Sequence, residues 1–216
     1  MGHGNQVFIV GVAGGSCSGK TTFSRRMREK AGEDHCRILY QDNYYYHVAF
    51  EKRKEVNFDS PEAIDFALLY EHLKALKSGQ DILVPSYDFS TYARRETPIE
   101  FISRPIVILE GLLILTQPLI RDLIDYSFFI EADTELRFKR RSERDVIERG
   151  RTKESVFEQF YSQVEPSHQE FVVPSKKYAN ELVSQESYLA NCDAIISKSL
   201  RYISDLKRKK QTDLSL

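Results

Sequence analysis

The sequence predicts an α/β protein built on a mostly parallel β-sheet with helices on both faces. Continuously apolar runs such as VFIVGV (7–12) and PIVILEGLLIL (105–115) alternate with segments of helical periodicity. This alternation is typical of parallel sheets, whose strands are buried on both sides. A glycine-rich segment directly follows the first run. Because ligands bind beyond the carboxyl ends of such strands, we expect the functional residues to follow the strands.

The composition indicates one globular domain, which we place over residues 1–216. Hydrophobic residues make up 41% and charged residues 29% of the 216 residues, and the formal net charge is −1. This near-neutral balance gives no overall field that favours nucleic acid or membrane as a partner. Any anion site must therefore be local.

Cysteine usage and the ends of the chain favour a cytoplasmic protein. Cys17, Cys36 and Cys192 are odd in number and widely spaced, which argues against a disulfide framework and a cysteine zinc site. The first six residues do not have the pattern of a signal peptide. The longest apolar run, 106–115, is too short to span a bilayer and contains Glu110.

The first half of the chain alternates strands and helices. Apolar strands are expected at 7–12 and 36–40, with a helix at 21–31 between them. A second helix is expected within 57–79. Ser60 is its predicted N-cap, Pro61 its first residue, and Gly79 its end.

The second half starts with a predicted hairpin, within about 82–103, set on the main sheet. Its strands, 81–89 and 95–102, contain Pro85 and Pro98, which favours edge positions. Core strands are then expected at 105–115, 126–132 and 193–196, and helices at 133–150 and 154–172. The basic tail, 207–216, is predicted to be solvated and partly disordered, with a nucleic-acid-binding arm as the less favoured alternative.

A phosphate-binding motif explains the glycine-rich segment. Gly14, Gly19, Lys20 and Thr21 fit G-x-x-x-x-G-K-[ST], between a predicted strand and a predicted helix. Glycines let main-chain N–H groups surround phosphate oxygens, and the helix N-terminus favours an anion. A chance glycine turn is the alternative. The predicted nucleotide-binding residues are Gly14, Gly15, Ser16, Cys17, Ser18, Gly19, Lys20, Thr21 and Thr22.

The motif predicts that a nucleoside triphosphate binds but does not identify what receives the phosphate. A small-molecule kinase, a GTPase switch and an ATP-driven motor or sensor all use such a loop. The guanine-reading pattern N-K-x-D is absent, which argues against the switch. The chain is also short for a motor. The acceptor must therefore be inferred from the other strand ends.

Three carboxylates follow predicted strands or begin a helix. Asp42, in QDNYYY, could accept the proton of an acceptor hydroxyl, or it could be an ordinary turn residue. Glu110 interrupts an apolar strand, which indicates either a place near Mg²⁺ or a satisfied core glutamate. Asp59 could hold a substrate with adjacent hydroxyls or could only cap the following helix.

A helix rich in arginine follows the fourth predicted strand. Arg137, Arg140, Arg141 and Arg144 are spaced so that they share one helical face, and Arg149 and Arg151 flank Gly150. The acidic residues of the segment allow a merely solvated, ion-paired helix. The alternative is a mobile lid, about 137–165, whose arginines offset charge on a transferring phosphate.

Taken together, these motifs resemble the uridine–cytidine kinase family. The matching stretches are GGSCSGKTT, QDNYY, NFDSPEAID, VPSYDF, ILEGLLIL, RRSERDVIERGR and QFYSQVEPSHQEFVVPSKKYAN, in register from about Val7 to Asn180. Phosphoribulokinases share part of this set. The resemblance implies a P-loop NTPase fold with a five-stranded parallel sheet, a small β-hairpin and a helical lid. It also implies transfer of the γ-phosphate of ATP or GTP to the 5′-hydroxyl of uridine or cytidine, in pyrimidine salvage, by a homotetramer.

The resemblance also assigns roles to individual residues. Asp42 is implied as general base, and Thr21, Asp42 and Glu110 as the surroundings of Mg²⁺. Arg144 and Arg149 match lid arginines that face phosphate, and Lys20 matches the phosphate-binding lysine. The implied substrate residues are Asp59 for the ribose, Tyr87 and Phe89 for the base, and Arg141, Arg151 and Gln159 near the nucleoside.

Two departures from the family pattern affect specificity. Tyr92 stands where the family has histidine, and a bulkier phenol could narrow the choice to cytidine, admit another acceptor or have no effect. After KKYAN the family continues with an IIPRG-like stretch, whereas this chain has ELVSQESYLANCD, which leaves ATP or GTP open. We expect a cytoplasmic pyrimidine nucleoside kinase. The alternatives are a kinase of another polyol, such as a pentose phosphate, and a non-catalytic nucleotide sensor.

Overall fold

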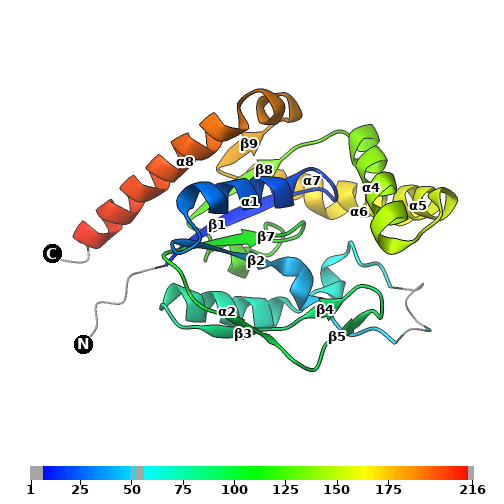
Figure 1. Ribbon diagram of the computed structural model, residues 1–216, viewed down its shortest axis with the longest axis horizontal. Coiled ribbons are helices and arrows are strands. Elements are labelled where there is room, and N and C mark those ends of the chain that lie inside the picture. Colours follow the sequence, from blue (N-terminus) through cyan, green and yellow to red (C-terminus); the bar gives the residue numbers. More distant parts are fainter. Residues whose placement is uncertain (1–6, 50, 52–55, 214–216) are drawn as a thin grey trace.

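A five-stranded, fully parallel sheet forms the centre of the protein (Figure 1). The computed structural model describes residues 7–49, 51 and 56–213. The strands are β1 (Phe8–Gly14), β2 (Cys36–Tyr40), β7 (Ile106–Glu110), β8 (Tyr126–Ile130) and β9 (Glu181–Val183). Their order is β2-β7-β1-β8-β9, and each neighbouring pair is parallel. The predicted fold class is confirmed.

Side chains of β1 alternate between two hydrophobic cores, which explains why the whole strand is apolar. Phe8, Val10 and Val12 pack toward α1 (Lys20–Ala31) and α8 (Gln185–Asp213). Ile9 and Ala13 belong to the core on the other face, to which α2 (Phe66–Lys77) and the short α3 (Pro118–Arg121) contribute buried residues. A sheet covered on both faces leaves its carboxyl edge as the place for a site.

The fifth strand is not where the sequence analysis expected it. Residues 193–196 lie within α8, and the edge strand is β9. The buried residues Cys192, Ile196 and Ile203 recur at helical spacing and pack against the α1 side of the sheet. α8 continues to Asp213, so the backbone of 207–213 is helical, and 214–216 lie outside the described residues, as do the first six.

The predicted hairpin forms two separate two-stranded sheets rather than an extension of the main sheet. β3 (Ile82–Val84) pairs with β6 (Ile99–Phe101), and β4 (Tyr87–Asp88) pairs with β5 (Ala93–Arg94), both antiparallel. Pro85 separates β3 from β4, and Pro98 precedes β6. Proline cannot donate to a strand ladder, so each long predicted strand is interrupted there.

The helix predicted within 57–79 begins later than expected. Ser60 starts only the 3₁₀ turn η3 (Pro61–Ala63), and its side chain makes no cap bond. α2 begins at Phe66, where the Asp65 carboxylate accepts a hydrogen bond from the backbone N–H of Leu68 at 3.0 Å. Asp65 is therefore the N-cap, and Asp59 is free of the capping role considered above.

The remaining elements carry the site. The 3₁₀ turn η1 (Gln41–Tyr44) follows β2, and α4 (Thr134–Arg149), Gly150 and α5 (Lys153–Gln159) form a two-helix unit that we call the lid. Helical turns continue through η4 (Phe160–Val164), α6 (Glu165–Ser167), η5 (His168–Val172), α7 (Val173–Ser175) and η6 (Lys176–Tyr178). Within the described residues, no helix combines the length and hydrophobicity needed to cross a membrane.

Candidate active site

The glycine-rich loop joins the end of β1 to the start of α1, as the motif predicts. Gly14 has a φ of 143°, and a Cβ there would lie 2.4 Å from the carbonyl oxygen of Ile130. Gly19, with a φ of 111°, is the N-cap residue of α1. The Lys20 ammonium donates to the carbonyl oxygen of Gly15 at 2.9 Å. The glycines therefore permit a backbone path that other residues would strain.

A cavity of about 450 Å³ opens above this loop, at the carboxyl edge of the sheet. We call it the donor cavity, because it contains the loop predicted to bind the phosphate donor. It is lined by Ser16, Cys17, Gly19, Lys20, Thr21, Thr22, Asp42, Glu110, Leu112, Arg140, Arg144 and Tyr188. The combination of a helix N-terminus, a lysine and two arginines suits a bound polyphosphate.

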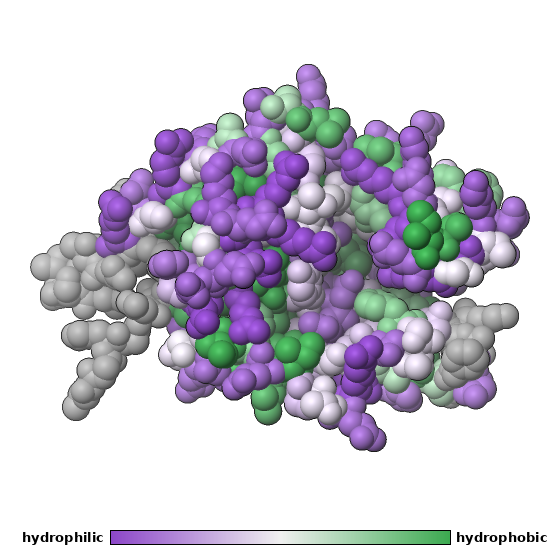
Figure 2. Space-filling model, viewed as in Figure 1, coloured by the Kyte–Doolittle hydropathy of each residue, from purple (hydrophilic) through white to green (hydrophobic). Residues whose placement is uncertain are grey.

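A second cavity of about 730 Å³ lies beside the first, between the lid and the β4–β5 segment. Figure 2 shows the surface hollowed at this place. We call it the acceptor cavity. It is lined by Ser16, Asp42, Tyr45, Phe58, Asp59, Tyr87, Asp88, Phe89, Ser90, Tyr92, Arg95, Leu112, Arg141, Arg144, Glu148, Arg149, Arg151 and Gln159. The residues that the sequence analysis predicted to contact the substrate therefore line one cavity, although they come from distant segments of the chain.

Asp42 lies on the boundary between the two cavities. It is in η1, directly after β2, and it lines both cavities. Ser16, Leu112 and Arg144 also line both. The Asp42 residue as a whole keeps an exposed surface. The surrounding protein nevertheless desolvates it and raises its pKa, while Lys20, Arg149 and Arg144 oppose that rise. The group can therefore take up a proton from a molecule in the acceptor cavity.

Glu110 ends β7 beside the nucleotide loop. The hydroxyl of Thr21 donates to its carboxylate at 3.0 Å, and burial raises its pKa, with Lys20 as the main opposing charge. The oxygen atoms of Thr21, Glu110 and Asp42 line one cavity and are the donor type that Mg²⁺ prefers. The described residues hold no cluster of three His, Cys, Asp or Glu side chains suited to a metal. A Mg²⁺ ion here would need oxygens of a bound triphosphate.

Gly111, directly after β7, lies against the side chain of Gln41. A Cβ at Gly111 would lie 2.4 Å from the Cβ of Gln41. The buried Gln41 amide oxygen accepts a hydrogen bond from the backbone N–H of Leu113 at 2.8 Å. Gly111 therefore makes room for Gln41, which fixes the η1 turn that carries Asp42.

Aromatic rings form one wall of the acceptor cavity. Tyr87 packs 5.1 Å from Phe89 and 5.3 Å from Tyr45, and Phe58 lies 5.5 Å from Tyr92, all between ring centroids. The Tyr87 hydroxyl is buried and has no hydrogen-bond partner among the described residues, and burial raises its pKa to about 12. The wall therefore offers flat apolar contact and one unused hydroxyl, which suits a planar heterocycle.

The lid covers the opposite side of the acceptor cavity. Gln159 accepts from Arg151 and, at 3.4 Å, from Arg141, whose other nitrogen donates to the Ser16 hydroxyl at 2.9 Å. Arg149 stacks over the ring of Phe89 at 5.1 Å, so the lid contacts the aromatic wall. Arg141, Arg151 and Gln159 all line the acceptor cavity, and their contact with a substrate stays a prediction.

Arg137 departs from the expected arginine face. It is buried, and its guanidinium pairs with Glu165 at 2.5 Å and contacts the carbonyl oxygen of Ala132 at 3.2 Å. Arg140 instead reaches the nucleotide loop, where it donates to the carbonyl oxygens of Cys17 and Ser18 at 3.4 and 3.3 Å. The helix is therefore not merely solvated, because its arginines connect the lid to the loop.

Several residues of the site were missed by the sequence analysis. Tyr45 and Phe58 line the acceptor cavity, and Tyr188 at the start of α8 lines the donor cavity. The stretch QDNYYY was a signal for Tyr45, since it directly follows a strand. His168 packs against Gly15, and a Cβ added at Gly15 would lie 2.7 Å from the His168 ring. Burial lowers the pKa of His168 to about 4. Nothing in its local sequence marks that position.

The chain is similar to known proteins over most of its length. The family model described as Phosphoribulokinase / Uridine kinase matches residues 9–188. A uridine kinase of Chloroflexus aurantiacus is 43% identical over 175 residues, covering 80% of this chain and 84% of that protein. A uridine kinase of Staphylococcus aureus is 40% identical over 181 residues, covering 82% and 87%.

A solved structure shows the same fold at low sequence identity. Phosphoribulokinase of Rhodobacter spheroides has a TM-score of 0.64 and 15% identity, covering 83% of this chain and 70% of that one. At this identity the likeness concerns the fold alone. The family match extends over most of the chain and includes the nucleotide loop, Asp42 and the lid. The chain therefore belongs to the phosphoribulokinase/uridine kinase family.

Proposed function

We propose that the protein transfers the γ-phosphoryl group of ATP to the 5′-hydroxyl of a pyrimidine nucleoside. The observation that carries this proposal is the position of Asp42, which lines both the donor and the acceptor cavity. The aromatic wall of the acceptor cavity suits a pyrimidine ring. The relatives named uridine kinase, at 40 and 43% identity, support the same substrate class.

Each group has a distinct task in this reaction. The amides of Gly14–Thr22 and the Lys20 ammonium hold the triphosphate, and Asp59 accepts hydrogen bonds from the ribose hydroxyls. Asp42 accepts the proton of the 5′-hydroxyl, and Arg144 and Arg149 offset the charge on the transferring group. Mg²⁺, held near Thr21, Asp42 and Glu110, would neutralise charge on the phosphates.

An acceptor panel tests the proposal. ADP release is measured with MgATP and then MgGTP, using uridine, cytidine or ribulose 5-phosphate as acceptor. We expect release with at least one of the two nucleosides. Release with ribulose 5-phosphate alone would replace the proposal by a pentose-phosphate kinase. Nucleotide binding without release for any acceptor would indicate a sensor.

Tyr92 is proposed to bias the acceptor toward cytidine. It lines the acceptor cavity, has an unusual φ of 57°, and its carbonyl oxygen accepts from the N–H of Val48 at 3.0 Å. This hydrogen bond fixes the backbone of Tyr92, and the ring contact with Phe58 at 5.5 Å packs the phenol against the aromatic wall. Replacement by histidine, Tyr92→His, is expected to shift the ratio of kcat/KM for cytidine over uridine toward uridine by roughly 3- to 10-fold. The matched control is Tyr202→Phe, on α8. An unchanged ratio in Tyr92→His would remove Tyr92 from the specificity.

The same proposal includes the pathway, the cellular compartment and the oligomeric state. A kinase of this kind would act in pyrimidine salvage, in the cytoplasm, as one kinase domain within a homotetramer. Size-exclusion chromatography with light scattering tests the assembly, and a dimer or monomer would contradict it. The MgGTP arm of the panel tests the choice of donor.

A further inference from the structure

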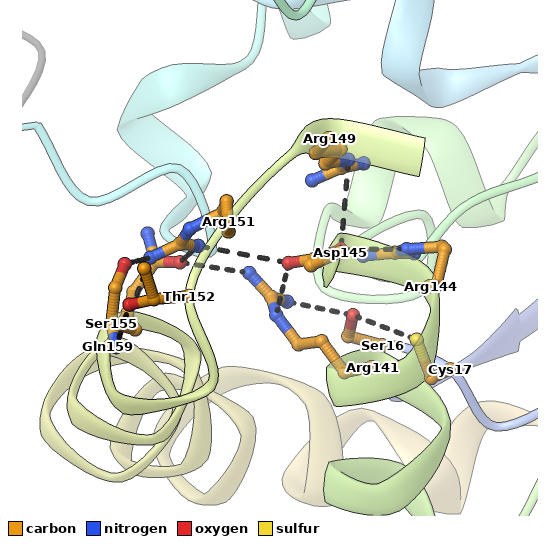
Figure 3. A network of polar contacts seen from close by, with 10 residues as sticks. All are labelled: Ser16, Cys17, Arg141, Arg144, Asp145, Arg149, Arg151, Thr152, Ser155 and Gln159. Atoms are coloured by element: carbon orange, nitrogen blue, oxygen red, sulfur yellow. Dashed lines mark hydrogen bonds and ion pairs between the residues drawn. The ribbon is translucent and has the colours of Figure 1, made fainter. Parts of the chain in front are cut away.

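Asp145, on α4, is a fully buried carboxylate surrounded by four guanidinium groups (Figure 3). Its Oδ1 atom accepts from Arg144 Nη2 at 2.7 Å and Nε at 2.9 Å, and lies 3.6 Å from Arg149 Nε. Its Oδ2 atom lies 3.5 Å from Arg141 Nε and 3.7 Å from Arg151 Nη1. The two oxygens thus divide the four arginines between them.

The local sequence explains how four arginines reach one carboxylate. Arg141 and Arg149 lie one helical turn before and after Asp145, and Arg144 is its neighbour. Gly150 has a φ of 63°, which reverses the chain at the end of α4. The N–H of Arg151 then donates to the carbonyl oxygen of Asp145 at 3.1 Å, and its side chain returns to the same carboxylate.

These arginines face the cavities, whereas Asp145 does not. Arg144 lines both cavities, and Arg141, Arg149 and Arg151 line the acceptor cavity. Asp145 is absent from the described residues that line either one. Within this cluster, one carboxylate against four guanidinium groups leaves an excess of positive charge, which faces Asp42 across the boundary between the cavities. The arginines can therefore bind phosphate oxygens while Asp145 holds them together.

We propose that Asp145 is a positioning residue for phosphoryl transfer, a buried anion that gathers the lid arginines and aims Arg144 at the boundary between the cavities. This inference rests on the proposed function and deepens it. Arginine side chains repel one another and have many rotamers, so without the carboxylate they would spread. Two N–H groups of Arg144 on one oxygen fix its planar fork in one orientation.

The first test is Asp145→Asn, which keeps the size of the side chain and removes its charge. The amide would also place an N–H₂ group beside guanidinium donors. We expect kcat to fall roughly 10- to 100-fold and the KM for MgATP to change less than about threefold, because the nucleotide loop is untouched. Glu143→Gln, an exposed residue of the same helix, is the matched control and should keep wild-type kcat. A wild-type kcat in Asp145→Asn would overturn the proposal.

A double-mutant cycle separates positioning from a general effect on the lid. If Asp145 acts mainly through Arg144, the fold-loss of kcat caused by Asp145→Asn should be several-fold smaller in the Arg144→Ala background than in the wild type. Fully multiplicative losses would instead show that Asp145 acts independently, which contradicts the proposal. Melting temperatures of all variants are measured in parallel.

Asp145→Glu keeps the charge but enlarges a fully buried side chain. We expect its kcat to exceed that of Asp145→Asn, and the reverse order would show that shape, not charge, matters. If Asp145→Asn fails to fold, Asp145→Glu carries the test. A loss of kcat in Asp145→Glu that is fully multiplicative with the loss in Arg144→Ala, at a wild-type melting temperature, would then contradict the proposal.

The cycle is also run on hydrolysis of MgATP without any nucleoside. This readout depends on the lid arginines but not on the acceptor. If the wild-type protein phosphorylates neither uridine nor cytidine, the proposed function fails, and the hydrolysis cycle still decides the role of Asp145. If nucleosides are phosphorylated and the cycle is multiplicative in both readouts, the role of Asp145 fails and the proposed function stands.

Discussion

Asp42→Asn is expected to lower kcat by at least about 100-fold, because the asparagine amide cannot accept the proton of the acceptor hydroxyl. The nucleotide loop and Lys20 are unchanged, so the affinity for MgATP should stay within about threefold. Steady-state ADP release gives kcat, and calorimetry with a non-hydrolysable analogue gives the affinity. The matched control is Asp34→Asn, an exposed residue just before the start of the same strand, β2. Near-normal turnover in Asp42→Asn would remove the proposed base.

The pH dependence of the wild-type enzyme tests the same residue independently. Desolvation raises the pKa of Asp42, and only the deprotonated carboxylate can act as a base. The value of kcat/KM for MgATP, which reports the ionisations of the free enzyme before Mg²⁺ binds, should therefore fall as the pH drops through this raised pKa, at a higher pH than an ordinary aspartate would give. This fall at low pH is the acidic limb of the pH profile, and the residual activity of Asp42→Asn should lack it.

The raised pKa also predicts the sign of the effect on stability. Asp42 binds its proton more tightly in the folded protein than in the unfolded chain. Its ionisation penalty therefore grows as the pH rises from the unfolded pKa to the raised folded pKa, is complete above the raised value, and is absent below the unfolded pKa. Without ligand at neutral pH, Asp42→Asn should melt at the same temperature as the wild type or higher. A lower melting temperature would contradict the desolvation.

The elements predicted well from the sequence are those whose local pattern admits one arrangement. β1 is apolar throughout because its alternate residues enter two cores, and the glycine loop must follow it to reach the helix N-terminus. The strand expected at 193–196 was wrong because a short apolar run fits either a strand or a buried helix. The structure forms a helix here because Cys192, Ile196 and Ile203, at helical spacing, all pack into the core on the α1 side of the sheet.

The site was predictable only where a motif marks it. Lys20, Thr21 and Asp42 follow strands, and their positions could be inferred from topology. The partners of a side chain could not, because they come from distant segments, as with Tyr45 and Phe58 in the aromatic wall. Asp145 shows the same limit. Its neighbours in the sequence are charged, as on a solvated helix, yet the return of the chain after α4 buries it completely.

Lys20→Ala should lower kcat/KM for MgATP roughly 100- to 1,000-fold, because the ammonium is the cation fixed within the nucleotide loop. The loop itself should persist, since the Gly15 carbonyl also accepts from the N–H of Ser18 at 3.1 Å. Lys30→Ala, at the other end of α1, is the matched control and should leave kcat/KM unchanged. A wild-type kcat/KM in Lys20→Ala would remove the lysine from triphosphate binding.

Lys20→Ala should also change the pH profile, which separates its charge from its shape. Lys20 is the leading positive charge that opposes the desolvation of both Asp42 and Glu110. Without it the pKa of each carboxyl rises further, so the acidic limb of the remaining activity should move to higher pH. Lys20→Arg keeps the charge and should keep the wild-type limb even if the longer side chain slows turnover. An unmoved limb in Lys20→Ala would show that this charge does not reach Asp42, and the electrostatic link between the nucleotide loop and the base would be lost.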